Sequence, residues 1–320
     1  MSILLQKPGI MTTVQDLGRT GSRRFGINPG GAMDRTAARL ANILVGNADG
    51  TAVLEIHFPS PQIVFEADAA AAIGGADFAP TLDSQTIENW RPFFAKKDSV
   101  LKFSEKVAGN RAYLAVKGGF QLEKWLGSSS ANLSAGFDGI LGRRCEIGDR
   151  IVLAEKATHH LDGQGVRISN SLIPLYSSFP TVRIIRGAEF EYLNAAGKRL
   201  FLDHDFSISN NSNRMGYRLT GNTIKLAKAR EFISSAVSYG TIQILPAGQL
   251  IVLMADHQTA GGYPRIGHVI TRDMPLLAQL GGNDKVAFHM VKVKEAEDLA
   301  LEFERELNFL RIACRFQANR

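Results

Sequence analysis

The chain has 320 residues, of which 45% are hydrophobic and 21% charged, a composition typical of soluble globular proteins with one or two domains. Its formal net charge is +6, but basic residues cluster only in pairs such as Arg23-Arg24, which argues against a nucleic-acid interface. No run approaches the ~18 apolar residues of a membrane span, and the apolar run near Met1 is too short for a signal peptide. We therefore expect a cytoplasmic protein that binds neither nucleic acid nor membrane.

Short strand-like runs dominate the sequence, and Gly, Pro, Asp or Asn separate them. The candidate strands are Val53 to Ile56, Gln62 to Phe65, Ala70 to Ile73, Val100 to Phe103, Arg111 to Val116, Arg150 to Ala154, Val182 to Arg186 and Ile242 to Leu245. Many short strands with turn signals favour barrels or sandwiches over a parallel doubly wound sheet. The sequence therefore predicts a mainly β fold with a few helices.

Three helices are predicted. The first follows Asp34, a favourable N-cap, and ends before Gly46; the second spans residues 273–280. The third covers about 296–310, where apolar residues recur at helical spacing opposite acidic residues and Arg. We expect this last helix to close the core, whereas an exposed apolar stripe on it would indicate a partner-binding element.

The region from Glu155 to Pro180 is rich in turn residues and shows no sustained periodicity, so it is the best linker candidate. We place a boundary near residue 175. The prediction is an N-terminal β-rich domain of residues 1–175 and a C-terminal β-barrel domain of residues 176–320 that ends in the closing helix.

The segment from Asp256 to Pro264 carries the strongest functional signal. An apolar run leads into Asp256, which could serve as a catalytic acid or base. Gln258 and Thr259 could orient a substrate, and the backbone at Gly261-Gly262 could approach it closely. If the strand continues through this segment, Asp256 and Gln258 share one face, and His257 lies on the other.

Two further segments are candidate binding sites. Gly30-Gly31 precedes the first predicted helix and could form a nest of N–H groups for a carboxylate or phosphate, or simply shape a tight loop. In the second segment, Arg214 suits a carboxylate, Asn213 could read an amide, and Tyr217 adds a further polar group. An ordinary Asn-rich turn explains this segment equally simply.

Several familiar site classes are not indicated. The Ser128-Ser129-Ser130 run resembles an anion-binding loop in composition, but no P-loop and no Gly-x-Ser-x-Gly elbow occurs in the chain. The two cysteines, Cys145 and Cys314, lie in no metal-ligand spacing, so we expect no metal site.

In combination and in this order, five motifs resemble the C-subunit family of bacterial ATP-dependent 5-oxoprolinase. This family is also called allophanate hydrolase subunit 2, and its domain forms half of the carboxyltransferase region of urea carboxylase and urea amidolyase. The motifs are Thr13-Val14-Gln15-Asp16-Leu17-Gly18-Arg19, Gly30-Gly31-Ala32-Met33-Asp34, Ala41-Asn42 with Val45-Gly46-Asn47, Ser212-Asn213-Arg214-Met215-Gly216-Tyr217-Arg218-Leu219, and Gly240-Thr241-Ile242-Gln243 with Asp256 to Pro264.

The resemblance implies two cyclophilin-like β-barrel domains and a complex with the B and A subunits of 5-oxoprolinase. That complex uses ATP and water to open 5-oxo-L-proline to L-glutamate, and the chain is expected to be inactive alone. A lactam with a carboxylate needs an Arg, an amide reader and donors to the developing oxyanion. Arg214, Asn213 and the Gly261-Gly262 backbone could supply these, and the resemblance points most directly to Asn213.

Two alternatives follow from the same resemblance. In the first, the chain is the carboxyltransferase half of a urea carboxylase, with biotin carried by another chain, because this chain has no Met-Lys-Met attachment motif. In the second, it is a regulatory binding partner of a kinase-inhibitor protein and turns over no substrate.

Overall fold

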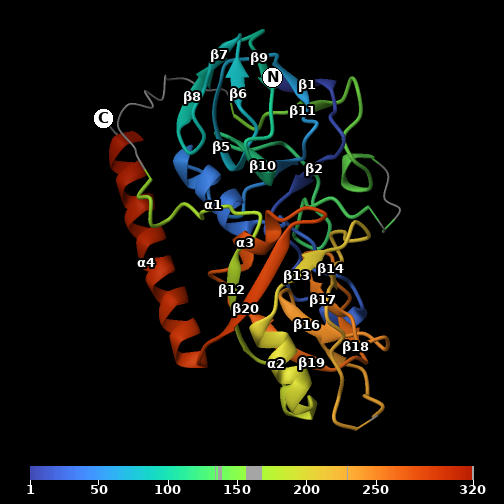
Figure 1. Cartoon of the computed structure of the whole chain (residues 1–320). Coiled ribbons are helices and arrows are strands. Elements are labelled where there is room, and N and C mark those ends of the chain that lie inside the picture. The colour runs from blue at the N-terminus through green and yellow to red at the C-terminus, as the bar shows by residue number, and fades with distance from the viewer. Residues whose placement is uncertain (134, 136–138, 156–167, 229, 319–320) are drawn as a thin grey trace. The chain divides into compact units, whose positions relative to one another are not determined.

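The computed structural model describes residues 1–133, 135, 139–155, 168–228 and 230–318 and divides into two compact units (Figure 1). Unit 1 comprises Met1–Arg19, Gly30–Pro174 and Glu304–Arg320, whereas unit 2 comprises Thr20–Pro29 and Leu175–Phe303. This organisation differs from the two continuous domains expected from the sequence. Thr20–Pro29 belongs to unit 2 and Glu304–Arg320 belongs to unit 1, because each of these segments contacts residues that are distant in sequence. Residues 156–167 of the predicted linker lie outside the described residues.

Unit 1 contains two antiparallel sheets that share one hydrophobic core. The order of the six-stranded sheet is β11 (Arg150–Val152), β1 (Ser2–Lys7), β4 (Gln62–Phe65), β9 (Val100–Phe103), β6 (Pro80–Leu82) and β7 (Gln85–Thr86). The order of the five-stranded sheet is β2 (Thr12–Gln15), β3 (Val53–Ile56), β10 (Ala108–Val116), β5 (Ala69–Asp77) and β8 (Pro92–Ala95). Alternation along β1 buries Ile3 and Leu5, as a half-buried strand requires. We expected a barrel in this part of the chain, and the described strands form these two sheets instead.

Helix α1 (Arg35–Leu44) of unit 1 forms where its N-cap predicts it. The Asp34 carboxylate accepts a hydrogen bond from the Ala37 backbone N–H at 2.9 Å. The helix packs on β5 and β10 (Figure 1), and β5 is rich in Ala and Gly, so the two backbones approach closely. A Cβ at Gly74 would lie 2.8 Å from the carbonyl oxygen of Ala37. The small residues of β5 therefore set the distance between helix and sheet.

Unit 2 is built on a closed seven-stranded barrel. Its strands, in order, are β12 (Thr181–Arg186), β19 (Arg265–Val269), β16 (Thr241–Ile244), β17 (Leu250–Leu253), β14 (Gly216–Thr220), β13 (Phe206–Ile208) and β20 (Lys285–Met290). The barrel closes through the parallel pairing of β12 with β20, and the other neighbouring pairs are antiparallel. The mainly β fold is thus confirmed, and the predicted C-terminal barrel is present.

The helices of unit 2 were predicted less completely than its strands. α3 (Met274–Ala278) lies within the predicted span of residues 273–280 and is shorter than it. α2 (Ala195–Asp203) was not predicted, because it is short and contains Gly197, but Asn194 caps it by accepting from the Gly197 N–H at 2.6 Å. Phe201 of α2 is buried among aromatic rings that include Phe288 at a centroid distance of 5.2 Å. Tertiary packing therefore stabilises a helix that its own sequence only weakly favours.

The last helix, α4 (Val293–Ala318), begins in unit 2 and ends in unit 1. Further short elements are the 3₁₀ turns η1 (Arg23–Phe25), η2 (Gly139–Leu141) and η3 (Phe190–Tyr192), and a ribbon of β15 (Ser235–Ala236) with β18 (Ala260–Gly261). In the part of the chain that the structure describes, no helix is both long and apolar enough to cross a membrane.

Candidate functional site

The loop after β17 brings together two of the predicted site residues within unit 2. It is held against the turn before β14 by two backbone hydrogen bonds, from Asp256 N to Arg214 O at 2.8 Å and from Met254 N to Met215 O at 3.1 Å. The Arg214 guanidinium then binds the Asp256 carboxylate in bidentate fashion, with Nε–Oδ2 at 2.8 Å and Nη2–Oδ1 at 3.1 Å. The side chains are only 11% and 15% exposed. Arg214 and Asp256 therefore form a partly buried ion pair that fixes the loop.

The expected strand geometry of this loop is wrong. Residues 255 and 256 form a turn, and the strand does not resume until β18. Alternation therefore does not place Asp256 and Gln258 on a common face. His257 is buried, and its Nδ1 lies 2.6 Å from the carbonyl oxygen of Gln258, an arrangement that fixes the ring against the backbone.

Gly261 and Gly262 occupy crowded positions beside amide groups. A Cβ at Gly261 would lie 3.0 Å from Nε2 of Gln243 and 3.4 Å from Nε2 of Gln258, so a larger residue here would press on both amides. A Cβ at Gly262 would lie 3.2 Å from the carbonyl oxygen of Phe232. The glycine pair therefore allows the 232–237 segment and two glutamine side chains to approach one backbone, and the Thr259 carbonyl accepts from Val237 N at 3.3 Å.

Gln243 of β16 is a candidate that the site prediction missed. Its side chain is fully buried in a strand that is otherwise mostly apolar. Nε2 donates to the Tyr263 carbonyl at 3.3 Å, whereas Oε1 is buried and accepts no hydrogen bond from the described residues. A buried acceptor without a donor costs free energy, so Gln243 Oε1 is a candidate acceptor for a ligand N–H. The signal was present in the sequence, because Gln243 interrupts the apolar run of its motif.

The two remaining candidates near Arg214 have different surroundings. Asn213 is exposed, and its Oδ1 accepts from the Met215 N–H at 2.8 Å, which closes a turn of the kind that Asn favours. Tyr217 is buried in the barrel and its hydroxyl donates to the Leu280 carbonyl at 3.2 Å. Asn213 is thus available at the surface, whereas Tyr217 contributes to the core.

A segment from the N-terminal part of the chain also reaches the loop. Within unit 2, Asn28 Nδ2 lies 3.4 Å from the carbonyl oxygen of Asp256, and Arg23 donates through Nη2 to the carbonyl oxygen of Val237. These contacts explain why residues 20–29 belong to unit 2. Arg265 adds a third support by donating to Ala236 O at 3.2 Å.

Arg265 is itself fixed by Glu189 through two hydrogen bonds, Nε–Oε2 at 2.9 Å and Nη2–Oε1 at 2.8 Å. These bonds from Arg265 lower the pKa of Glu189 below its usual range. On the same strand, burial lowers the pKa of His268, whose Nδ1 lies 3.4 Å from the Thr241 hydroxyl. Strand β19 therefore carries an arginine fixed in an ion pair and a histidine whose pKa is lowered by burial.

Gly30 and Gly31 belong to unit 1 and have a clear local role. A Cβ at Gly31 would lie 2.8 Å from Gly18 N and from Leu17 C, and its φ of +94° favours glycine. The neighbouring Asp16 accepts four hydrogen bonds, from the backbone N–H groups of Gly18 and Ser129 and from the hydroxyls of Ser128 and Ser130. The close approach of two backbones accounts for this glycine, and the serine run is part of a buried polar cluster.

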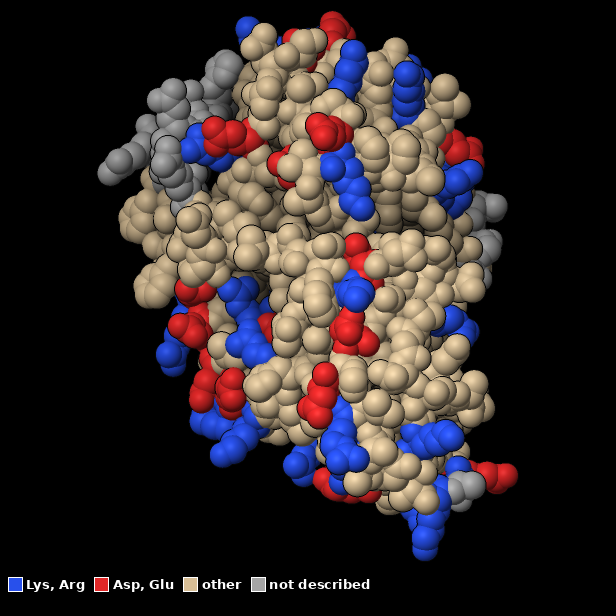
Figure 2. Space-filling model, in the orientation of Figure 1, with Lys and Arg blue, Asp and Glu red and all other residues tan. Residues whose placement is uncertain are grey.

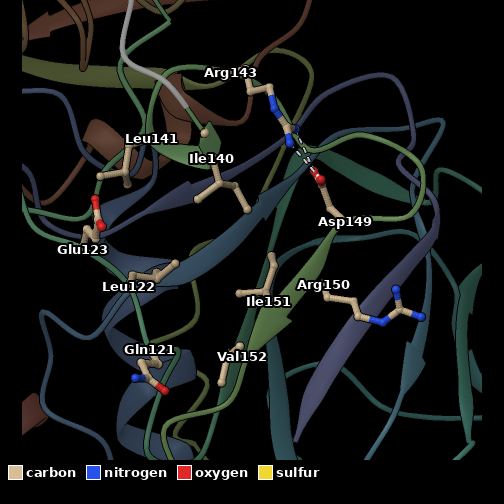
Figure 3. A pocket seen from close by; sticks show the side chains of 11 residues that line it. Gln121, Leu122, Glu123, Ile140, Leu141, Arg143, Asp149, Arg150, Ile151 and Val152 are labelled. Atoms are coloured by element: carbon tan, nitrogen blue, oxygen red, sulfur yellow. Dashed lines mark hydrogen bonds and ion pairs between the residues drawn. The ribbon is translucent and has the colours of Figure 1, made fainter.

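A pocket of about 400 Å³ opens in unit 1 (Figure 3). Leu122, Ile140 and Ile151 point toward its open space, and the Arg143–Asp149 ion pair lies at its edge with both oxygens bound at 2.7 and 2.8 Å. None of the predicted site residues lines it. In the described part of the chain, no group of three or more His, Cys, Asp or Glu residues could hold a metal ion.

Comparisons with known proteins agree with the motifs. A family model described as "Carboxyltransferase domain, subdomain A and B" matches residues 25–290. The chain is 35% identical to the 5-oxoprolinase C subunit of Haemophilus influenzae, covering 93% of this chain and 94% of that protein. It is 37% identical to the 5-oxoprolinase C subunit of Escherichia coli, covering 91% of each.

Among solved structures, the urea amidolyase of K. lactis superimposes with a TM-score of 0.90 at 25% identity, over 97% of this chain but only 20% of that much longer protein. The sequence resemblance is therefore confirmed, and the chain belongs to the carboxyltransferase domain subdomain A and B family, together with the C subunits of 5-oxoprolinase.

Proposed function

We propose that the chain is the C subunit of an ATP-dependent 5-oxoprolinase and opens 5-oxo-L-proline to L-glutamate in a complex with the A and B subunits. The observation that carries the proposal is similarity over nearly the full length of two proteins named as C subunits of 5-oxoprolinase. The urea amidolyase similarity covers only a fifth of that protein, so it supports a shared domain more than a shared reaction.

The proposed reaction begins with transfer of the γ-phosphoryl group of ATP to the amide oxygen of the lactam. Water then adds to the activated carbon, and the ring C–N bond breaks as the nitrogen takes up a proton, which gives γ-glutamyl phosphate. A second water hydrolyses this acyl phosphate to glutamate and phosphate. The loop after β17 and the residues around it offer several groups for these steps. Asp256 keeps acceptor capacity beyond the two donors of Arg214, because a carboxylate has about four lone-pair sites. We assign it the role of catalytic base toward water.

Gln243 is our candidate for reading the lactam N–H, because its buried Oε1 accepts nothing from the described residues. Asn213 keeps a donor at the surface for the substrate amide, since the bond of its side chain to Met215 uses only Oδ1. Arg214 is held by Asp256, so we assign it to positioning the loop and the carboxylate side of the substrate. Gln258 and Thr259, on the same loop, complete the proposed substrate contacts.

The test is ATP-dependent release of glutamate from 5-oxoproline, measured for the chain alone and after co-expression with the A and B subunits. We expect turnover only in the full set. Asp256→Asn should lower kcat, and Gln243→Met should raise KM. Asn211→Ala is the matched control for Asn213→Ala, because Asn211 is exposed in the same turn. The hydrogen bond from its backbone N–H to Ser209 Oγ, at 3.2 Å, does not involve the side chain and is retained in the variant. Normal kinetics for Asn213→Ala and Gln243→Met would remove them from the substrate site.

The alternative is biotin-dependent carboxyl transfer to urea, which the urea amidolyase superposition favours. Carboxylation of urea with a biotin carrier chain, and no glutamate release from a verified complex, would establish it. Under this alternative the biotin carrier is another chain, because this chain contains no biotin-attachment motif.

A further inference from the structure

The C-terminal half of α4 has two apolar faces. Leu307, Leu310 and Cys314 are buried, as a core-closing helix requires. On the opposite side, Phe309, Ile312 and Phe316 recur at i, i+3 and i+7 and are 74%, 50% and 71% exposed. We call these three residues the outer stripe. Isolated exposed apolar residues are common, but two phenylalanines and an isoleucine on one helical face mark an interaction surface.

The outer stripe is presented by a helix that is firmly attached to unit 1. Arg39 donates to Glu304 at 2.6 and 2.8 Å and to Asp49 at 2.8 Å, and Arg311 donates to Asp49 at 2.9 Å. These ion pairs and the buried face fix the rotation of the helix about its axis. The stripe is therefore preorganised, so little ordering entropy opposes binding there.

Two basic residues border the outer stripe, one near each end. Arg305, one turn before Phe309, continues its row, and Arg315 borders Phe316; both are exposed and neither forms an ion pair with a described residue. Figure 2 shows that the half of α4 toward the C-terminus is mostly uncharged, whereas the other half carries both acidic and basic residues. Of the acids in this part of α4, Glu304 is bound by Arg39, Glu306 is hydrogen-bonded to Ser171 at 3.0 Å, and Glu302 is exposed.

A second copy of this chain is a poor occupant. In a parallel pair of helices in register, Arg305 would face Arg305 of the copy, and the two like charges would repel each other. In an antiparallel pair centred at Phe309, Arg305 would lie on Ile312 of the copy, and no carboxylate would face it.

We propose that the outer stripe docks a helix of another protein in the complex, with an apolar row bordered by carboxylates that face Arg305 and Arg315. This is a helix-on-helix contact read through i, i+3 and i+7 anchors. The inference rests on the proposed function only in that it takes the A and B subunits as the source of the partner helix.

The experiment measures the affinity of the purified chain for the co-expressed A and B subunits. The double variant Phe309→Glu/Phe316→Glu should weaken binding by at least about 30-fold, as expected for buried aromatic anchors. Arg305→Glu/Arg315→Glu should weaken it less, with the loss larger at low salt. Ile233→Glu is the control, because Ile233 is 93% exposed and lies outside α4. Circular dichroism and melting temperature should match the wild type for each variant, because these side chains are exposed.

Wild-type affinity in the double variant would overturn the docking surface. So would a wild-type chain that binds neither partner, or one that is a dimer alone and becomes a monomer in the double variant. The proposed reaction is judged separately. A complex that forms through the stripe without releasing glutamate refutes the reaction and supports the surface, whereas turnover by the double variant at wild-type concentrations of the A and B subunits refutes the surface alone.

Discussion

The Arg214–Asp256 ion pair should contribute measurably to the stability of unit 2. Exposed pairs contribute about 0.2–1 kcal/mol, and removing one partner of a fully buried pair costs about 3–5 kcal/mol. Side-chain exposures of 11% and 15%, with two hydrogen bonds at 2.8 and 3.1 Å, place this pair between those limits. We therefore expect Asp256→Asn and Arg214→Gln each to destabilise the protein by about 2 kcal/mol.

The assay is urea unfolding of the wild type, both single variants and the double variant, followed by circular dichroism. The free energy of unfolding of the double variant should fall by less than the sum of the two single decreases, because the second substitution removes a charge that is already unpaired. Most of the coupling should persist in 1 M NaCl, since salt screens partly buried charges weakly. A coupling energy below about 0.5 kcal/mol, the usual limit of additivity for independent sites, would refute the view that this pair fixes the loop.

Two further predictions concern backbone geometry and pH. Gly31→Ala should destabilise the protein by about 2–4 kcal/mol. The alanine would have to adopt the left-handed backbone conformation of Gly31, and its Cβ would lie 2.8 Å from backbone atoms. Gly46→Ala, with a φ of +77° and no atom within 4 Å, should cost only about 1 kcal/mol; equal losses in thermal unfolding would contradict the steric argument. Arg265 lowers the pKa of Glu189 in the folded protein. The stabilisation that this pair provides is therefore fully present above the pKa of Glu189 in the unfolded chain, about 4.3, and is lost as pH falls through its lower pKa in the folded protein. Unfolding free energies measured from pH 7 down to pH 3 should therefore fall less steeply for Arg265→Met, and parallel curves would show that this pair is not responsible.

Local patterns predicted the elements that depend on local physics. The Asp34 cap located α1, and apolar runs between turn residues located strands such as β3, β4 and β9 at their observed bounds. The family motifs also located the loop at Asp256. The sequence did not predict which side chains bind each other when they lie far apart along the chain. Arg214 was expected to hold a substrate carboxylate, yet it binds a carboxylate of the chain 42 residues away.

The Ser128–Ser130 run has the same explanation. Its composition suggested an anion-binding loop, and the anion that it binds is Asp16, more than a hundred residues earlier in the chain. Helix α2 escaped prediction because Phe201 is stabilised by rings from other elements, which no local pattern records. The expected continuation of the strand through Asp256 failed for a related reason, since backbone bonds to Arg214 and Met215 hold a turn there.

The chain passes between the two units four times, after residues 19, 29, 174 and 303. A single cut in the gene can therefore not release either unit complete. A fragment that ends at residue 174 loses the helix that buries Leu307 and Leu310, and a fragment that begins at 175 loses the segment that contacts Asp256. A duplication, fusion or transfer that keeps both units complete therefore has to include the whole chain. Its relatives fit that constraint, because the match spans 97% of this chain even where it makes up one fifth of a far longer polypeptide.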